Sequence, residues 1–145
     1  MKKVLGLFTL LMIVMSFTTK SVSKSKQEDV TGIVFKHISL EDAKKQAVKS
    51  GKIIFIDAYT SWCGPCKKMA ATTFKDEAVA KLFNQKFINL KIDVENDLDG
   101  PEIEKMYKVQ AYPTMLFIDG KGKLKKSILG FHEPDQLLGI AKSIN

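Results

Sequence analysis

Residues 53–69 read IIFIDAYTSWCGPCKKM, and this stretch decides the fold. It opens with four consecutive apolar residues, 53–56, a pattern typical of a strand that is covered on both faces of a sheet. A short loop leads to Cys63, and the residues after it have helical composition, with Pro65 in the first turn, where no backbone N–H is needed. The stretch therefore predicts a central strand followed by a helix whose first turn carries two cysteines, Cys63 and Cys66.

Segments typical of strands and helices alternate on both sides of this junction. Strands are expected at residues 33–38, 52–59, 87–94, 114–118 and 124–129, and helices at 39–49, 63–74, 76–85, 101–107 and 134–143. The sequence DGKG at 119–122 favours a hairpin between the last two strands. This order predicts one α/β domain with a central mixed sheet flanked by helices.

Composition excludes several other classes of protein. The chain has 145 residues, of which 45% are hydrophobic, enough for a single domain with a core of its own. Two cysteines are too few for a disulfide scaffold. The formal net charge is +7, but lysine supplies all of the positive charge. A chain without arginine lacks the guanidinium group, which can form two hydrogen bonds at once to guanine or to a phosphate. We therefore expect a solvated lysine surface and no nucleic-acid partner.

The N-terminus resembles an export signal. Lys2 and Lys3 precede an apolar run at 4–17, which fits a signal-peptide core and falls short of the ~20 residues that span a bilayer. The small residues at 21–23 favour cleavage there. We predict a signal peptide at 1–23, a polar linker at 24–31 and the folded domain at 32–145, with an uncleaved N-terminal membrane anchor as the alternative.

The cysteine pair carries the predicted chemistry. Cys63 stands where unpaired backbone N–H groups and the positive end of the helix dipole stabilise a thiolate, which lowers a cysteine pKa from about 8.5 into a range of roughly 3.5–7.5. Cys66 lies one helical turn further on, so that its sulfur can reach Cys63. We interpret Cys63 as an exposed nucleophile and Cys66 as the residue that resolves the mixed disulfide.

Three alternatives for the cysteines are weaker. A structural disulfide closing so short a loop removes only about 2 kcal/mol of unfolded-state entropy, against ~3 kcal/mol for fifteen residues. A zinc site needs four ligands, and a thiol hydrolase needs a base beside the sulfur. His37 and His132, the only histidines, lie far from the cysteines in sequence, so we expect no metal site.

We interpret the acidic run at 95–100 as a solvated loop.

Three segments together carry a resemblance to a known family. DAYTSWCGPCKKM at 57–69 resembles the active-site segment of thioredoxin, AYPT at 111–114 resembles that family's cis-proline loop, and Gly130 matches the glycine after its last strand. The likeness runs from about residue 53 to 131 and implies a thioredoxin-like sandwich. Residues 72–76 and the inserted helix look closest to exported members, similar to the C-terminal periplasmic domain of the transmembrane thiol-disulfide interchange protein, which implies a periplasmic location.

The resemblance implies roles for further residues. Asp57 matches the family's buried aspartate, whose pKa burial should raise so that it can accept the proton of Cys66; the alternative is an exposed aspartate that caps the next turn. Pro113 would follow a cis peptide bond beside the sulfurs and turn the Tyr112 backbone outward, where an extended client can pair with it. The buried lysine of thioredoxin aligns with Asn89, and Lys91 on the same strand face is its possible substitute.

The same resemblance implies a client-binding surface around the sulfurs. Trp62 would form a partly exposed wall of the site, with ordinary core packing as the lesser alternative. Gly64 and Pro65 would complete the surface together with Tyr112.

The expected activity is dithiol–disulfide exchange. Gly-Pro between the cysteines resembles the reducing members of the family, so we expect a reductase or isomerase of exported protein disulfides, with no cofactor beyond the Cys63–Cys66 disulfide. The chain has no second cysteine pair and no nucleotide motif, so we expect a membrane thiol–disulfide relay to recharge it. We also expect it to act as a monomer. The alternatives are a reductant dedicated to cytochrome c maturation, an oxidase, and a non-catalytic binding module with the same fold.

Overall fold

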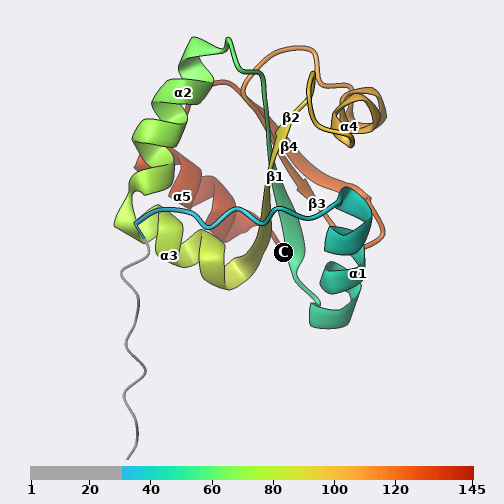
Figure 1. The fold of residues 1–145 in the computed structure, drawn as a ribbon. Coiled ribbons are helices and arrows are strands. Elements are labelled where there is room, and N and C mark those ends of the chain that lie inside the picture. Colours follow the sequence, from blue (N-terminus) through green and yellow to red (C-terminus); the bar gives the residue numbers. More distant parts are fainter. Residues whose placement is uncertain (1–30) are drawn as a thin grey trace, which may run out of the picture.

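The computed structural model describes residues 31–145 (Figure 1). The predicted signal peptide and almost all of the predicted linker lie outside the described residues. Within 31–145, none of the helices is both long enough and apolar enough to cross a bilayer.

Four strands form one mixed sheet. They are β1 (Ile53–Tyr59), β2 (Phe87–Asp93), β3 (Thr114–Ile118) and β4 (Leu124–Leu129), and their order across the sheet is β2-β1-β3-β4. β1 runs parallel to β2 and antiparallel to β3, and β3 and β4 form the hairpin expected from the DGKG sequence. The unbroken apolar block at 53–56 therefore marks an interior strand, as the sequence predicts.

Helices cover both faces of the sheet (Figure 1). α1 (Leu40–Ser50) and α4 (Gly100–Tyr107) lie on one side, and α2 (Gly64–Ala71), α3 (Glu77–Lys86) and α5 (Pro134–Ser143) lie on the other. The predicted sandwich of a mixed sheet between helices is confirmed.

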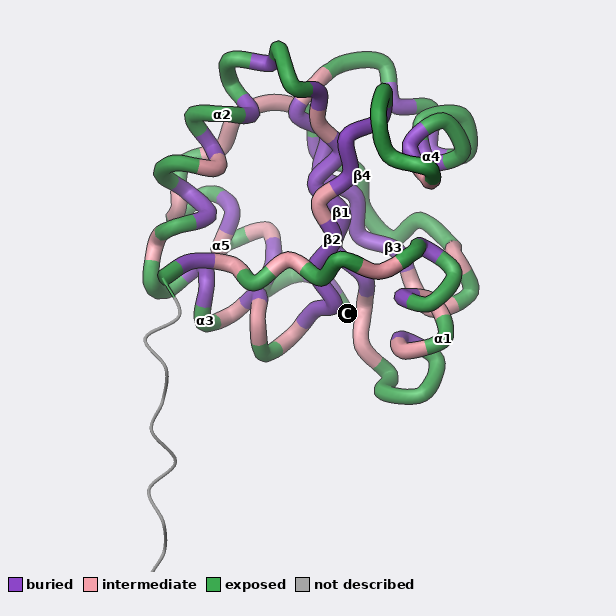
Figure 2. The backbone as a smooth tube through the Cα atoms, in the orientation of Figure 1, coloured by how far each residue is buried: buried purple, intermediate pink, exposed green. Residues whose placement is uncertain are grey.

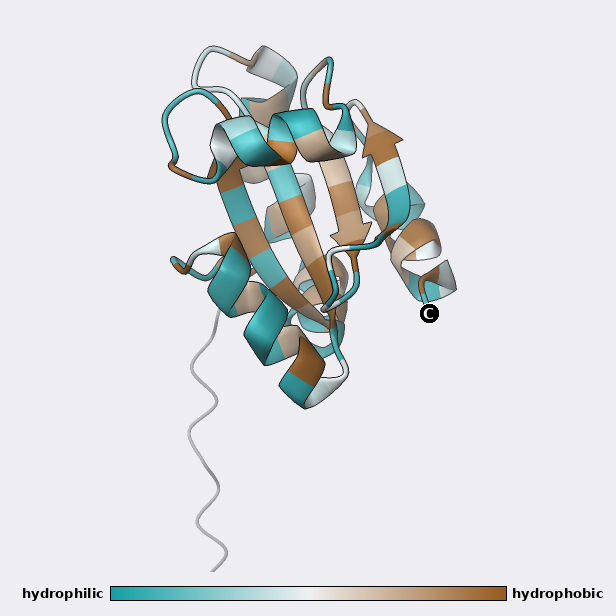
Figure 3. Ribbon diagram, turned by 90° about the vertical axis from the view of Figure 1, so that its right-hand side faces the viewer, coloured by the Kyte–Doolittle hydropathy of each residue, from teal (hydrophilic) through white to brown (hydrophobic). Residues whose placement is uncertain are grey.

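Alternation along the strands divides the core into two clusters, one on each face of the sheet. Ile54 and Ile56 pack with α1 and α4, whereas Phe55 packs with Phe83 and Phe117 on the side of α2, α3 and α5. Figure 2 shows the buried residues along the strands, and Figure 3 shows hydrophobic residues concentrated there, with hydrophilic ones on the outer sides of the helices. Because successive side chains of a strand point to opposite faces, Asp57 lies on the same side as Phe55 and hence on the side of α2.

The helix expected at 63–74 is shorter in the structure. α2 ends at Ala71, and a single 3-10 turn, Thr73–Lys75, connects it to α3. Thr73 is fully buried and donates its hydroxyl to the carbonyl oxygen of His132 at 2.7 Å, a tertiary bond to the loop before α5 that sequence pattern does not reveal. Asp76 then caps α3 by accepting a hydrogen bond from the Val79 amide, as its position predicts.

The strand expected at residues 33–38 is absent from the described sheet, so that prediction is wrong. The segment runs extended beside β2 but makes a single backbone bond to it, from the Lys36 amide to the Asn89 carbonyl at 2.8 Å. At Val34, asparagine side chains bond the backbone in place of a neighbouring strand: the Val34 amide donates to Asn84 Oδ1, and Asn89 Nδ2 donates to the Val34 carbonyl. The segment is therefore held by side chains in place of a regular strand ladder.

Candidate active site

The two cysteines form a disulfide at the start of α2, with their Cα atoms 5.3 Å apart. Cys63 is the N-cap residue of this helix, and its sulfur accepts a hydrogen bond from the Cys66 amide at 3.2 Å. The first turn carries no acidic side chain that would oppose a negative charge. An amide donor and the helix dipole thus both meet the Cys63 sulfur, and both stabilise a thiolate there once the disulfide is reduced.

The prediction that Cys63 is exposed is wrong for the disulfide state. Cys63 is 3% exposed and Cys66 is 2% exposed. The Cys63 sulfur is turned toward the helix, where it is bonded to the Cys66 sulfur and receives the Cys66 amide. A client disulfide must therefore approach through the residues that surround the pair.

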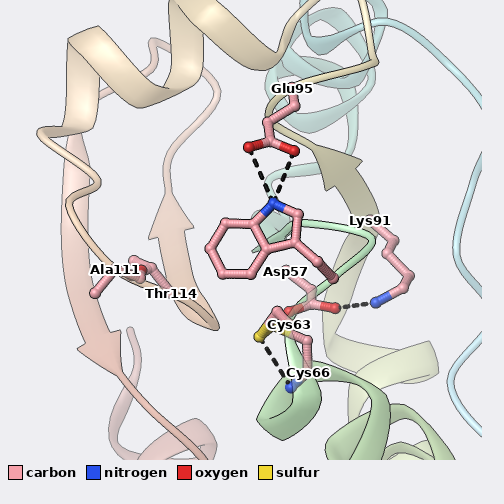
Figure 4. The surroundings of a disulfide bond; sticks show 8 residues. Asp57, Cys63, Cys66, Lys91, Glu95, Ala111 and Thr114 are labelled. Atoms are coloured by element: carbon pink, nitrogen blue, oxygen red, sulfur yellow. Dashed lines mark hydrogen bonds and ion pairs between the residues drawn. A yellow bond between two sulfur atoms is a disulfide. The ribbon is translucent and has the colours of Figure 1, made fainter.

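Asp57 lies in β1 as a buried carboxylate. It is 1% exposed, and its Oδ2 forms an ion pair with the Lys91 ammonium (Figure 4). Burial raises the pKa of Asp57, and the nearby Lys91 charge opposes that rise only in part. Its Oδ1 has no hydrogen-bond partner among the described residues. The alternative of an exposed aspartate that caps a turn is contradicted.

Lys91, the predicted substitute for the family's buried lysine, pairs with Asp57. It is in register with Asp57 in the parallel pair of β1 and β2, whereas Asn89 is opposite Phe55. The Lys91 ammonium also lies 4.0 Å from the centre of the Tyr59 ring. A small cavity of about 90 Å³ is lined by both Lys91 and Cys66, so the ion pair and the second sulfur border the same space.

Trp62 and Tyr112 form an aromatic wall beside the disulfide. Trp62 is 64% exposed, which excludes core packing, and its ring centre lies 6.0 Å from that of Tyr112 in an edge-to-face arrangement. The indole Nε1–H of Trp62 donates to both carboxylate oxygens of Glu95, at 3.0 and 3.1 Å (Figure 4). The hydroxyl of Tyr112 donates to Glu104 Oε1 at 2.9 Å. Throughout, "aromatic wall" denotes these two rings.

The loop before β3 contains the expected cis bond, between Tyr112 and Pro113. Thr114 Oγ1 donates to the Ala111 carbonyl at 2.6 Å, and the Gly130 amide donates to the Pro113 carbonyl at 2.8 Å. Neither hydrogen bond involves the backbone amide or carbonyl of Tyr112. These are the groups with which the backbone of an extended client would pair.

The remaining predicted client-binding residues lie between the two cysteines in the chain. Gly64 and Pro65 are exposed in the first turn of α2.

The histidines lie away from the cysteines in the chain: His37 is in the segment before α1, and His132 is in the loop before α5, with its Nδ1 at 2.9 Å from the Gly130 carbonyl. Over residues 31–145, no three His, Cys, Asp or Glu side chains are grouped to hold a metal ion.

Sequence reasoning missed Glu95 and Glu104. The composition of residues 95–100 favours a solvated loop, yet Glu95 accepts a hydrogen bond from Trp62. A topological signal was available, because Glu95 follows β2 as Trp62 follows β1, and the carboxyl ends of neighbouring parallel strands meet at one edge of a sheet. Nothing in the sequence links Glu104 to Tyr112, since that contact depends on how α4 packs.

The arrangement is chemically suited to thiol–disulfide exchange. It combines a sulfur at a helix start, a second sulfur one turn away and a buried carboxyl with a raised pKa in the strand beneath them. These are the parts that the reaction needs: a stabilised thiolate, a resolving thiol and a carboxyl that can accept the proton of the resolving thiol.

Comparison with known proteins gives the same result. The family model described as thioredoxin-like matches residues 36–120, more than half of the chain. The thiol:disulfide interchange protein DsbD of Actinobacillus pleuropneumoniae is 33% identical over 98 residues, which is 66% of this chain and 17% of that protein. Thioredoxin-1 of Drosophila melanogaster is 36% identical over 75 residues, 52% of this chain and 64% of that one. The chain thus spans about a sixth of the DsbD relative.

Solved structures agree with the fold. A candidate disulphide-isomerase from Bacteroides thetaiotaomicron has 40% sequence identity and a TM-score of 0.67, and the match covers 76% of this chain and 91% of that one. The reduced C-terminal domain of Neisseria meningitidis DsbD has 26% identity and a TM-score of 0.63, and covers 73% and 94%. On the family match and the geometry of its cysteine site, the chain belongs to the thioredoxin-like family.

Proposed function

We propose that the chain is an exported thiol–disulfide oxidoreductase that reduces or isomerises disulfides in client proteins. The observation that carries the proposal is the pair Cys63–Cys66 at the N-terminus of α2, above the buried Asp57. Relatives named as thiol:disulfide interchange proteins and protein disulfide-isomerases support the same class of reaction.

The proposed reaction begins with the reduced protein. The Cys63 thiolate attacks one sulfur of a client disulfide, a bond forms between Cys63 and that sulfur, and the other client sulfur leaves as a thiolate that takes up a proton. The client is then held by a mixed disulfide.

The second step releases the client. Cys66 gives its proton to Asp57 and attacks the Cys63 sulfur, which forms the Cys63–Cys66 disulfide and expels the second client thiolate. Two electrons have passed to the client. Lys91 stabilises the charged form of Asp57 and lines the cavity beside Cys66, so it tunes the pH at which this transfer occurs.

Export and recharging are further parts of the proposal. The N-terminal sequence of the kind that directs export supports a periplasmic location, where no soluble dithiol pool supplies electrons. A membrane thiol–disulfide relay is the proposed donor, supported by the likeness to DsbD. Sequencing the N-terminus of the protein recovered from the producing cell tests export, because an intact residue 1 would contradict cleavage of a signal peptide.

Two cysteine variants test the reaction. The reduced protein is expected to reduce insulin, a client unrelated to any haem protein, and Cys63→Ser is expected to abolish this activity. Cys66→Ser should accumulate mixed disulfides that electrophoresis resolves without reductant, whereas Cys63→Ser should accumulate none. A reduced wild-type protein that reduces neither insulin nor apocytochrome c would identify a binding module. Reduction of apocytochrome c without reduction of insulin would identify the dedicated reductant.

A further inference from the structure

Both rings of the aromatic wall are held at their polar ends by carboxylates from one stretch of chain. Glu95 lies just after β2 and accepts from Trp62, and Glu104 lies in α4 and accepts from Tyr112. The two rings meet edge to face at 6.0 Å. The wall is therefore a continuous chain of contacts, Glu95–Trp62–Tyr112–Glu104, beside the Cys63–Cys66 disulfide.

The stretch that supplies these carboxylates is itself held in place. Asp93, at the end of β2, accepts hydrogen bonds from the Glu95 amide at 3.1 Å and from Asn96 Nδ2 at 3.0 Å. The Leu40 amide at the start of α1 donates to Asp99 Oδ2 at 2.6 Å, which ties the loop to a second helix. α4 then buries Ile103 completely, one residue before Glu104.

Tyr112 connects this framework to the client side of the site. Its ring is half-buried against the core cluster of α1 and α4, and its residue precedes the cis bond to Pro113. The ring can rotate about its side-chain torsions unless something holds the hydroxyl, and Glu104 is the group that does so. A side chain fixed before a client arrives loses less conformational freedom when the client binds.

We propose that Glu104 is a positioning residue for polypeptide clients, acting through Tyr112: it fixes the Tyr112 ring against Trp62, so that the aromatic wall is already formed when a client chain packs beside the disulfide. This inference rests on the proposed function. Glu104 does not touch the reacting sulfurs, so it acts on client binding and not on the exchange chemistry.

The hydrogen bond persists over the pH range of such assays. Burial, together with the bond to Glu104, raises the pKa of Tyr112 to about 12, so the hydroxyl keeps the proton that it donates. Because Glu104 itself is exposed on α4, its replacement by alanine preserves a good helix former and removes no core contact. The variant is therefore expected to fold.

The test compares a polypeptide disulfide with a small one. Insulin must pack against the wall, whereas the aromatic reagent dithiobis(nitrobenzoate) is small enough to react without it. For Glu104→Ala and for Tyr112→Phe we expect the KM for insulin to rise about fivefold with kcat unchanged, and the double variant to be no worse than either single one, since both remove the same bond. The rate with the small disulfide and the equilibrium with glutathione should stay within twofold.

Two further variants distinguish loss of the Glu104–Tyr112 hydrogen bond from loss of a negative charge and from a change in the stability of α4. Glu104→Gln keeps an oxygen acceptor for the Tyr112 hydroxyl and should restore the KM for insulin, whereas Glu102→Ala removes an exposed carboxylate from the same helix without touching the wall and should change nothing. A wild-type KM for Glu104→Ala, additive effects in the double variant, or an equal loss with the small disulfide would each overturn the proposal. If the unmodified protein reduced the small disulfide but not insulin, the proposed function would fail and this inference with it, an outcome distinct from the previous three.

Discussion

Asp57 and Lys91 face each other across the parallel strands β1 and β2 and form an ion pair on the side of the sheet that α2 covers. The two members differ in exposure: Asp57 is 1% exposed, and the Lys91 side chain is 26% exposed. The cation can thus be hydrated while the carboxylate cannot. This asymmetry explains why burial raises the pKa of Asp57 despite the ion pair.

The raised pKa of Asp57 makes stability depend on pH. Because the folded pKa lies above the unfolded value, the folded state binds more protons between the two, and the free energy of unfolding falls as pH rises through the folded pKa. Asp57→Ala should remove this slope and be more stable than the wild type at pH 8, by about 1–3 kcal/mol, since a buried carboxylate with an unpartnered oxygen is lost.

Urea unfolding at several pH values between 4 and 9 measures this difference. The gain for Asp57→Ala should shrink toward low pH, as the wild-type carboxyl takes up a proton. A stability difference between Asp57→Ala and the wild type that stayed constant from pH 4 to pH 9 would contradict a raised pKa. The same variant should slow the release of mixed disulfides by roughly 10²-fold, the lower end of what a general base contributes.

Lys91→Met should act in the opposite sense. Without the ammonium, the Asp57 carboxylate loses its only ion-pair partner among the described residues, and its pKa should rise further. We expect a loss of about 1–3 kcal/mol at pH 8 and a much smaller loss at pH 5, where the carboxyl can hold a proton. The pH at which client release accelerates should move upward.

The double variant Asp57→Ala/Lys91→Met is the control for this experiment. Once the carboxylate is gone, removal of the lysine has no charge left to expose, so the pH-dependent part of the loss should disappear. An equal loss from Lys91→Met in the presence and absence of Asp57 would assign the effect to the contact of Lys91 with Tyr59.

The position of Cys63 at the start of α2 predicts its reactivity. In the Cys66→Ser variant, Cys63 is the only thiol, and its rate of alkylation by iodoacetamide should reach half its maximum well below pH 8.5. The same variant unfolded in urea loses the helix dipole and the amide donor and should titrate as an ordinary thiol. Identical titrations in the folded and unfolded forms would remove the physical basis of the proposed nucleophile.

Gly100 sets the start of α4 and, through that helix, the place of Glu104. A Cβ atom at this position would lie 2.5 Å from the Val94 carbonyl oxygen, too close for the backbone to remain where it is. Gly100→Ala should cost about 1–3 kcal/mol, the usual price of overpacking. It should also raise the KM for insulin, because the displaced helix carries Glu104 away from Tyr112.

Gly139→Ala is the matched control for that change. Gly139 lies in α5 with no atom within 4 Å of the added Cβ, and alanine is the better helix former, so stability should rise by about 0.5–1 kcal/mol with activity unchanged. Comparable stability losses in the two variants would show that the contact with Val94 is not the cause.

Local signals in the sequence were enough for most of the fold. The apolar block 53–56, the cap Asp76 and the hairpin sequence 119–122 each specify an element through its immediate neighbours. The segment at 33–38 has the alternation of a strand and is not one. Its backbone groups are taken in part by the side chains of Asn84 and Asn89, which are some fifty residues away and invisible to a local pattern.

By itself, the sequence determined the reactive centre: two cysteines one turn apart, at a junction of strand and helix, place a sulfur where amides and a dipole meet it, and this depends only on neighbouring residues. Only the tertiary structure decided which groups surround that centre. The choice of Lys91 over Asn89 follows from strand register, and the engagement of Glu95 and Glu104 follows from where a loop and a helix pack. Both are contacts between distant parts of the chain, which exist only once the sheet has formed and its helices have docked.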